Sequence, residues 1–284
     1  MNSMDLQNYN LEQTLLGGQS FTWEKTDENY IGTYKNSQIV LNYKNNILKW
    51  QTFPKEDDLE LITSYLNIDS VYESIIKEIL KDEHIINAVK SNSGVRILNQ
   101  DFETVLMNFI LSSHKSVKGV RKLVKDISKE YGVQIKSVYG ISYSFPTAKV
   151  ISNLTEKDLR DIGAGFRAPY LKAASEKLVK DKLFIENLYN LTTEEVKEYL
   201  MSFKGIGEKI ADCILVFGLK KTDITPLDIW GKRVLTDFYN IDQKTSYKAM
   251  SKWYSEYFGK NTAIAGQMLF EYIRKLPKQN SNSK

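Results

Sequence analysis

Apolar and polar residues alternate along the first part of the chain, between residues 21 and 53. The alternating runs are FTWEK, YIGTYK, QIVLNYK and ILKWQTF, and short turn-forming segments such as TDEN, NS and NN separate them. Alternation with a period of two is typical of strands that bury one face. The pattern therefore predicts an antiparallel sheet with one face packed against a core.

From about residue 56 the apolar residues take helical spacing, and we expect that spacing to continue to the end of the chain. The expected helices cover residues 70–90, 101–113, 117–131, 155–162, 169–180, 193–201, 207–218, 229–238, 245–258 and 262–275. Asp101, Thr155 and Thr192 stand at the start of three of them, and their side chains are good N-terminal caps. The sequence thus predicts an α+β fold, with an antiparallel β domain over residues 1–68 and an all-helical body over residues 69–284.

Composition then narrows the kinds of site that the chain can hold. The single cysteine, Cys213, rules out an intramolecular disulfide, an iron–sulfur cluster and a cysteine-rich zinc site. The two histidines, His84 and His114, show no ligand spacing, so no metal site is expected. The first ten residues are polar and no apolar run is long enough to span a bilayer, which favours a cytoplasmic protein without a membrane partner. The net charge of +4 is too small to indicate nucleic acid by itself.

The most informative segment is residues 199–235, YLMSFKGIGEKIADCILVFGLKKTDITPLDIWGKRVL. Gly205 and Gly207 flank Ile206 between two expected helices, so the backbone can turn tightly while Ile206 enters the core. The N–H groups that open the second helix would then face a phosphate oxygen. This arrangement predicts a helix–hairpin–helix over about residues 199–218, a sequence-independent grip on DNA. An ordinary helical corner that needs glycine is the alternative.

Two charged residues follow the hairpin at a fixed spacing. Lys209 lies in the first turn of the second helix, where the helix dipole opposes a cation and favours the neutral amine that a nucleophile needs. Asp228 lies 19 residues later, in TPLD, at the expected start of the next helix. A capping carboxylate stays ionised and can stabilise a positive charge that develops in a cleft. The alternatives are a phosphate-binding lysine and a purely structural cap.

At this point the sequence resembles the helix–hairpin–helix/Gly-Pro-Asp DNA glycosylase superfamily, and within it the 8-oxoguanine DNA glycosylase/lyase branch. The resemblance rests on GIGEKIADC followed by TPLD, and it runs almost from end to end. The other similar segments, in order, are LLGGQSFTW (15–23), GVRILNQDFETVLMNFILSS (94–113), LRDIGAGFRAPYLKAAS (159–175) and AIAGQMLFEYIRK (263–275). Matches in the right order are far more specific than any single motif.

The resemblance implies that Lys209 attacks the sugar carbon that bears a damaged base and that Asp228 steadies the cationic sugar. A Schiff base and β-elimination would follow, so the protein would need no metal or organic cofactor. By the same likeness four further residues meet the flipped base or its partner: the carbonyl of Gly18 senses N7–H, Cys213 and Phe270 pack on its two faces, and Arg167 contacts the base left unpaired. Taken alone, these four residue types more often serve as a turn, two core residues and a phosphate contact.

Departures from the branch fall at positions that contact bases and DNA. His114, Lys115 and Ser116 stand where the branch has an asparagine triplet that wedges into the emptied stack, and Gly119 replaces a second arginine. Gly266 replaces the glutamine that reads the pairing edge of the base, although Gln267 is adjacent, and Trp230 replaces a phosphate-contacting histidine. Lys115, Lys118, Lys122 and Lys125 form a basic row that is either a phosphate contact or a solvated helix face.

We therefore expect a monomeric base-excision enzyme, a DNA glycosylase with abasic-site lyase activity that removes 8-oxoguanine from double-stranded DNA. Two alternatives remain. A monofunctional alkylpurine glycosylase has the same fold and does not need Lys209. A non-catalytic helix–hairpin–helix module would hold DNA without base discrimination or covalent chemistry.

Overall fold

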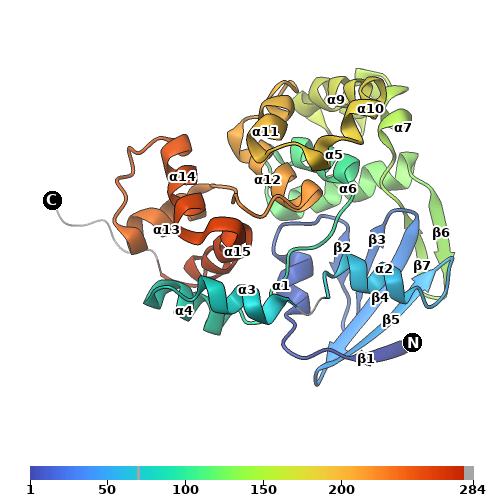
Figure 1. Ribbon diagram of the computed structural model, residues 1–284. Helices are drawn as coiled ribbons and strands as arrows, with labels where there is room; N and C mark the ends of the chain where they lie inside the picture. The colour runs from blue at the N-terminus through green and yellow to red at the C-terminus, as the bar shows by residue number, and fades with distance from the viewer. Residues whose placement is uncertain (69–70, 278–284) are drawn as a thin grey trace.

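The computed structural model describes residues 1–68 and 71–277, and its N-terminal part contains a five-stranded antiparallel sheet (Figure 1). The spatial order is β1-β5-β4-β3-β2. The strands are β1 (Asn2–Asp5), β2 (Trp23–Lys25), β3 (Tyr30–Tyr34), β4 (Ser37–Lys44) and β5 (Ile47–Phe53). The four alternating runs of the sequence are confirmed as β2 to β5. The edge strand β1, with the sequence NSMD, was not expected because it contains no β-branched or aromatic residue.

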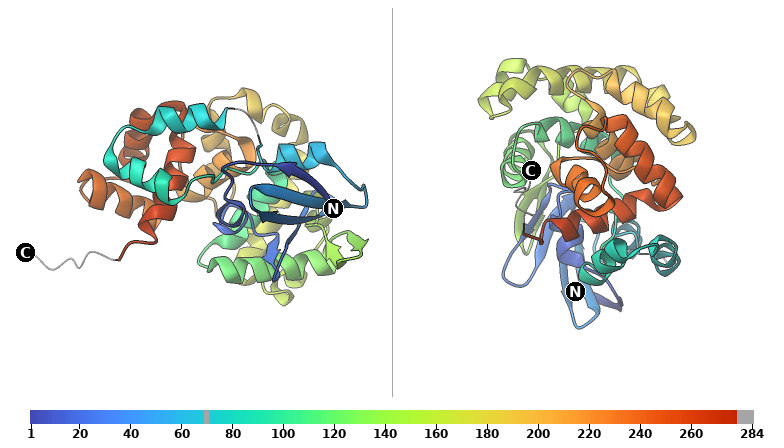
Figure 2. Two further views of the ribbon diagram at one scale, coloured as in Figure 1. Left: turned by 90° about the horizontal axis from the view of Figure 1, so that it is seen from below. Right: turned by 90° about the vertical axis from the view of Figure 1, so that its left-hand side faces the viewer.

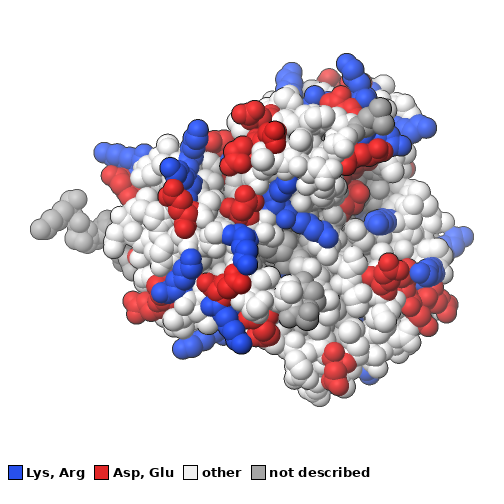
Figure 3. Space-filling model, viewed as in Figure 1, with Lys and Arg blue, Asp and Glu red and all other residues white. Residues whose placement is uncertain are grey.

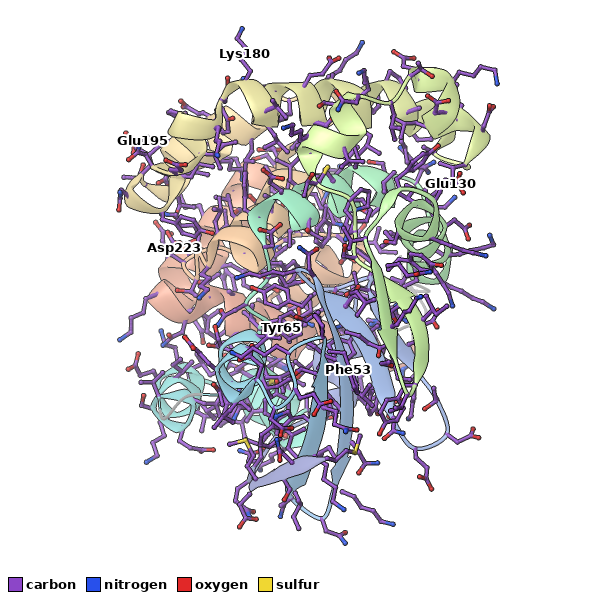
Figure 4. All side chains as sticks on the ribbon, turned by 90° about the vertical axis from the view of Figure 1, so that its right-hand side faces the viewer. Phe53, Tyr65, Glu130, Lys180, Glu195 and Asp223 are labelled. Carbon is purple, nitrogen blue, oxygen red and sulfur yellow. The ribbon has the colours of Figure 1, made fainter. Side chains whose placement is uncertain are left out.

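One face of the sheet is buried beneath two short helices, α1 (Leu11–Leu16) and α2 (Leu59–Tyr65). Trp23 of β2 is 1% exposed and its indole N–H donates to the hydroxyl of Tyr65 at 2.7 Å. Figure 4 shows Tyr65 reaching from α2 toward the sheet. The expected burial of one face is confirmed, but the other face is also covered in part, because Val40 and Phe53 are buried as well.

The body that follows is mainly helical rather than all-helical, which corrects the expectation of helical spacing throughout. Residues 134–143 form a two-stranded hairpin, β6 (Gln134–Ser137) and β7 (Gly140–Tyr143), beside the free face of the sheet (Figure 4). Ile135 packs with Phe53 and Val40 there. The alternation in VQIKSVYGISY was the available signal, and Gly140, at φ +102°, allows the tight turn.

The helices of the body fall into two groups, each with its own apolar core (Figures 1 and 2). The first group is α5 (Phe102–Ser112), α6 (Val117–Tyr131), α7 (Ala148–Ser152), α8 (Glu156–Asp161), α9 (Ala168–Lys180), α10 (Lys182–Ile185), α11 (Thr193–Met201) and α12 (Glu208–Leu219). The second is α3 (Tyr72–Ile79), α4 (Glu83–Ser91), α13 (Ile229–Tyr239), α14 (Tyr247–Phe258) and α15 (Thr262–Ile273). Helices α3 and α4 therefore pack against the C-terminal helices α13 to α15, although the two segments are far apart in the sequence.

Local capping explains where several helices begin. The side chains of Asp101, Thr155 and Thr192 each accept a hydrogen bond from the backbone N–H three residues later, as expected. The expected helix over 70–90 is wrong in one respect, because it is two helices. Asp82 interrupts it by accepting from the N–H groups of His84 and Ile85 at 2.8 and 3.1 Å, which starts α4.

Within residues 1–68 and 71–277, every helix is too short or too polar to cross a lipid bilayer.

Candidate active site

A cavity of about 290 Å³ lies where the N-terminal domain and the two helical groups meet. Its volume is at the small end of the range for ligand pockets. Most of the residues singled out from the sequence line it: Gly18, Lys115, Lys209, Cys213, Asp228, Trp230, Gly266, Gln267 and Phe270. Segments from residue 17 to residue 274 thus converge on one site.

The helix–hairpin–helix connects α11 to α12 beside this cavity. Ile206 is 6% exposed and belongs to the first helical core, as expected. Gly205 has φ +87°, and a Cβ there would lie 2.5 Å from the ring of Tyr170, so only glycine fits. Gly207 precedes α12 and has open space around it. The backbone immediately before α12 is consequently open on the side where a side chain of residue 207 would stand.

Lys209 and Cys213 lie one turn apart on α12 and both line the cavity. The half-buried Lys209 places its Nζ 5.7 Å from the centre of the Phe109 ring. Cys213 is 2% exposed. Burial raises the pKa of its thiol to about 11, against the opposing effect of the Lys209 charge, so Cys213 is a neutral, apolar wall.

Asp228 is the N-cap of α13, as the sequence predicted. Its Oδ1 accepts from the backbone N–H groups of Trp230 and Gly231 at 2.8 and 3.0 Å. These two bonds fix the carboxylate at the edge of the cavity that holds Lys209. A half-buried carboxylate held by backbone donors is suited to stabilise positive charge without reorganising.

The loop that carries Gly17 and Gly18 is held by buried hydrogen bonds. Gln19 is 1% exposed; its Nε2 donates to the carbonyls of Thr14 and Arg96 at 2.9 and 2.8 Å. Its Oε1 accepts from the N–H of Leu98 at 2.8 Å. Gly18 has φ +101°. Gln19 could not be identified from the sequence, because a buried glutamine has no sequence signature apart from its surroundings in the fold.

Helix α15 supplies another wall of the cavity. A Cβ on Gly266 would lie 2.1 Å from Oγ1 of Thr225, so this position excludes any side chain. Gln267 also faces the cavity and is 8% exposed, and its Nε2 lies 3.4 Å from an oxygen of Glu271. Phe270 is half-buried and lines the cavity one turn later.

Three phenylalanines that the sequence analysis did not single out line the cavity as well. Phe109 stacks on Phe217 with ring centres 5.7 Å apart, and Phe21 meets Phe109 edge-on at 5.4 Å. Phe21 lies just before β2, Phe109 on α5 and Phe217 on α12. In the sequence each of them has the pattern of an ordinary core residue. An aromatic floor of this kind suits a flat heterocycle.

His114 and Arg167 lie outside the cavity but next to each other. His114 is exposed and has φ +51°. Arg167 is 6% exposed, and its Nε donates to the carbonyl of Ser113 at 2.7 Å, which holds the turn that presents His114. The neighbouring Phe166 is 48% exposed, with its ring centre 6.1 Å from that of His114. This exposed aromatic residue was missed, although its position in GFRAPY beside Arg167 was a signal.

Two of the four lysines in the basic row, both on α6, form ion pairs. Lys122 pairs with Asp126 at 2.6 Å and Lys125 with Glu24 at 2.8 Å, and both lysines are exposed. Lys115 is the member that lines the cavity. On the face shown in Figure 3, basic and acidic side chains are interspersed. Among the residues that the structure describes, no group of three or more His, Cys, Asp or Glu side chains could hold a metal ion.

The chain matches two protein families along most of its length. Residues 3–106 match the N-terminal domain of 8-oxoguanine DNA glycosylase, and residues 107–260 match the HhH-GPD superfamily of base excision DNA repair proteins.

Individual relatives agree with this assignment. An N-glycosylase/DNA lyase of Saccharomyces cerevisiae is 30% identical over 265 residues, which cover 84% of this chain and 70% of the yeast protein. The structure of a Clostridium acetobutylicum 8-oxoguanine glycosylase/lyase with double-stranded DNA containing cytosine opposite 8-oxoguanine superposes with a TM-score of 0.88. That pair is 27% identical, over 96% of this chain and 98% of the other. A 3-methyladenine DNA glycosylase from Archaeoglobus fulgidus shares the fold at 19% identity, with a TM-score of 0.78 over 97% of this chain and 99% of the other.

Proposed function

This chain belongs to the HhH-GPD superfamily and, within it, to the 8-oxoguanine N-glycosylase/DNA lyases, and we propose that it excises 8-oxoguanine from duplex DNA. The observation that carries the proposal is the meeting of Lys209, Cys213 and Asp228 in one small aromatic-floored cavity. Such a cavity is reached only by a base that has left the helix.

The proposed reaction begins at the sugar. The amine of Lys209 forms a bond to C1′ while the C1′–N9 bond breaks, and the base leaves with the bonding electrons. The carboxylate of Asp228 stabilises the positive charge on the sugar ring. Opening of the ring gives a Schiff base between Lys209 and C1′, and loss of a proton from C2′ then expels the 3′ phosphate. The chain supplies both reacting side chains, so a monomer suffices.

Base recognition is proposed to come from the cavity walls. The backbone of Gly18, held by Gln19, would accept the N7–H that distinguishes 8-oxoguanine from guanine. Cys213 and Phe270 would pack on the two faces of the base. Because Gly266 has no room for a side chain, Gln267 is our candidate for contact with the pairing edge.

DNA binding is proposed to use surfaces on both sides of the cavity. Gly205 and Gly207 would let the first-turn N–H groups of α12 meet a phosphate, and Trp230 and Lys115 would contact the strand near the flipped nucleotide. His114, with Phe166 beside it, is placed to fill the gap that the base leaves. To contact the unpaired base, Arg167 would have to break its hydrogen bond to the carbonyl of Ser113. In this structure it holds the turn that presents His114.

Borohydride trapping tests the proposal directly. Duplexes with 8-oxoguanine opposite each of the four bases would be incubated with wild type, Lys209→Gln and the matched control Lys204→Gln. Lys204 is an exposed lysine of the same hairpin. We expect a covalent adduct with wild type and Lys204→Gln, and none with Lys209→Gln, which should still bind lesion DNA.

Two results would contradict the proposal. Release of the base without a trappable adduct would mean that the enzyme is monofunctional. If no base is released and no adduct forms on a lesion panel that includes alkylated purines, the protein binds DNA without catalysis. The dependence on the opposite base reports what His114 and Gly119 do.

A further inference from the structure

We propose that Tyr247 positions the loop that carries Asp228, through a buried polar network of Lys197, Asp212, Tyr247 and the backbone N–H of Leu227. The proposal rests on the function proposed above. Tyr247 is the first residue of α14, and its hydroxyl donates to Oδ2 of Asp212 at 2.6 Å. The hydroxyl oxygen of Tyr247 also accepts a hydrogen bond from the backbone N–H of Leu227 at 3.2 Å. Leu227 directly precedes Asp228.

Asp212 is the centre of this network. It lies on α12, three residues after Lys209 and next to Cys213, and its side chain is fully buried. Burial raises the pKa of its carboxyl, and the charge of Lys197 opposes that shift. The Nζ of Lys197, from α11, lies 2.7 Å from Oδ1. A buried carboxylate without a partner is strongly destabilising. The fold therefore keeps Lys197 and Tyr247 in contact with Asp212.

The network joins three parts of the proposed machinery. Lys197 belongs to the first helix of the helix–hairpin–helix, Asp212 to the helix of Lys209, and Leu227 to the loop that ends at Asp228. Leu227 is 2% exposed, so its N–H needs a protein partner, and the Tyr247 hydroxyl is the one it has. The hydroxyl of Tyr247 therefore links the loop that ends at Asp228 to the helix that carries Lys209.

The two chemical steps depend differently on where this loop holds Asp228. Base release needs Lys209 and Asp228 together, because a cationic sugar forms as the amine attacks. Strand cleavage at a ready-made abasic site starts from an aldehyde, so it needs Lys209 much more than Asp228. A misplaced Asp228 loop should slow the first step selectively, and small misplacements of reacting groups cost about 100-fold.

Tyr247→Phe is the test, because it removes the hydroxyl and keeps the ring that packs 5.4 Å from Nζ of Lys197. We expect the single-turnover rate of 8-oxoguanine release to fall roughly 10- to 100-fold. The Kd for lesion DNA and the rate of abasic-site cleavage should each stay within about threefold of wild type, a small difference in free energy. Asp212→Asn, which keeps the volume and loses the charge, should change the rates in the same direction.

Tyr257→Phe is the matched control. Tyr257 lies on the same helix, and its hydroxyl donates to Oδ2 of Asp82 at 2.9 Å. Within the described part of the chain, no hydrogen bond joins its side chain to the Asp228 loop. Tyr257→Phe should leave base release unchanged. If Tyr247→Phe releases base as fast as wild type, or slows both chemical steps and DNA binding equally, the positioning role is wrong.

Hydrogen exchange gives a readout that does not need activity. In Tyr247→Phe, the peptide that spans residues 224–231 should exchange faster than in wild type and in Tyr257→Phe. Unchanged exchange there would overturn the proposal by itself. If instead the loop loosens as expected but wild type neither releases base nor forms an adduct, the network stands and the proposed function fails.

Discussion

Single residues at this site combine a structural task with a chemical one. Asp228 caps α13 through two backbone donors while it faces the cavity. The motif TPLD predicted the cap, whereas the place of Asp228 beside Lys209 was implied by the family resemblance. The requirement for glycine at residue 266 was not predictable, because the atom that excludes a side chain belongs to Thr225, 41 residues earlier in the chain. The local sequence pattern thus identifies caps and turns. It does not identify which residues, distant in the sequence, come into contact when the chain folds.

Cys213 offers a prediction with a defined pH dependence. Only the thiolate reacts with alkylating reagents, and burial raises the thiol pKa from 9.0 to about 11. Well below both values this lowers the thiolate fraction about 100-fold. Native protein at pH 8 should therefore react at least that much more slowly with iodoacetamide than unfolded protein, and the rate should rise as the pH approaches 11. Because the chain has one cysteine, mass spectrometry reads the site directly. Equal rates in the native and unfolded protein would contradict the buried thiol.

Gly266→Ala probes the contact between α15 and the loop before Asp228. The new Cβ would meet Oγ1 of Thr225 at 2.1 Å, so the loop or the helix must move. We expect the free energy of unfolding in urea to fall by about 1–3 kcal/mol and base release to slow. Adding Thr225→Ala removes the colliding oxygen and should recover part of both losses. If Gly266→Ala unfolds at the same urea midpoint as wild type, the loop or the helix moves to accommodate the new Cβ without loss of stability.

At the scale of elements, periodicity and caps predicted most strands and helices of the described chain. The failures have local causes. The hairpin β6–β7 is short and follows a long helix, so its alternation was overlooked, and the expected helix over 70–90 is divided because Asp82 caps a new helix. The elements that build the cavity were predicted from sequence, including the start of α12 at Gly207 and of α13 at Asp228. Their convergence was implied only by the family resemblance.

The basic row illustrates what helical spacing leaves open. The spacing allowed either a phosphate-binding face or a solvated helix face, and Lys122 and Lys125 have carboxylate partners on the protein itself. Surface pairs of this kind contribute little stability, but they reduce the charge available to DNA. Lys115, which precedes the helix and lines the cavity, is the better candidate.

At the scale of the whole molecule, DNA affinity should depend on few charges, because the net charge is only +4. We expect Lys115→Ala to reduce the slope of log Kd against log salt concentration by about 0.9, the value for one phosphate contact. Lys122→Ala, on the adjoining helix, should leave the slope unchanged because Lys122 pairs with Asp126. Fluorescence anisotropy between roughly 50 and 200 mM salt measures both. Equal slopes for Lys115→Ala and wild type would remove Lys115 from the DNA contact.

The N-terminal domain and both helical groups contribute residues to one cavity, and this has a consequence for how the protein is made. Gly18 emerges from the ribosome long before Phe270, although both residues line the same cavity. Helices α3 and α4 must likewise wait for α13 to α15 before their apolar faces are covered. An unfinished polypeptide therefore has no enclosed place for a base, even though Lys209 has already been synthesised. Translation itself therefore withholds the assembled cavity until Phe270 has been synthesised.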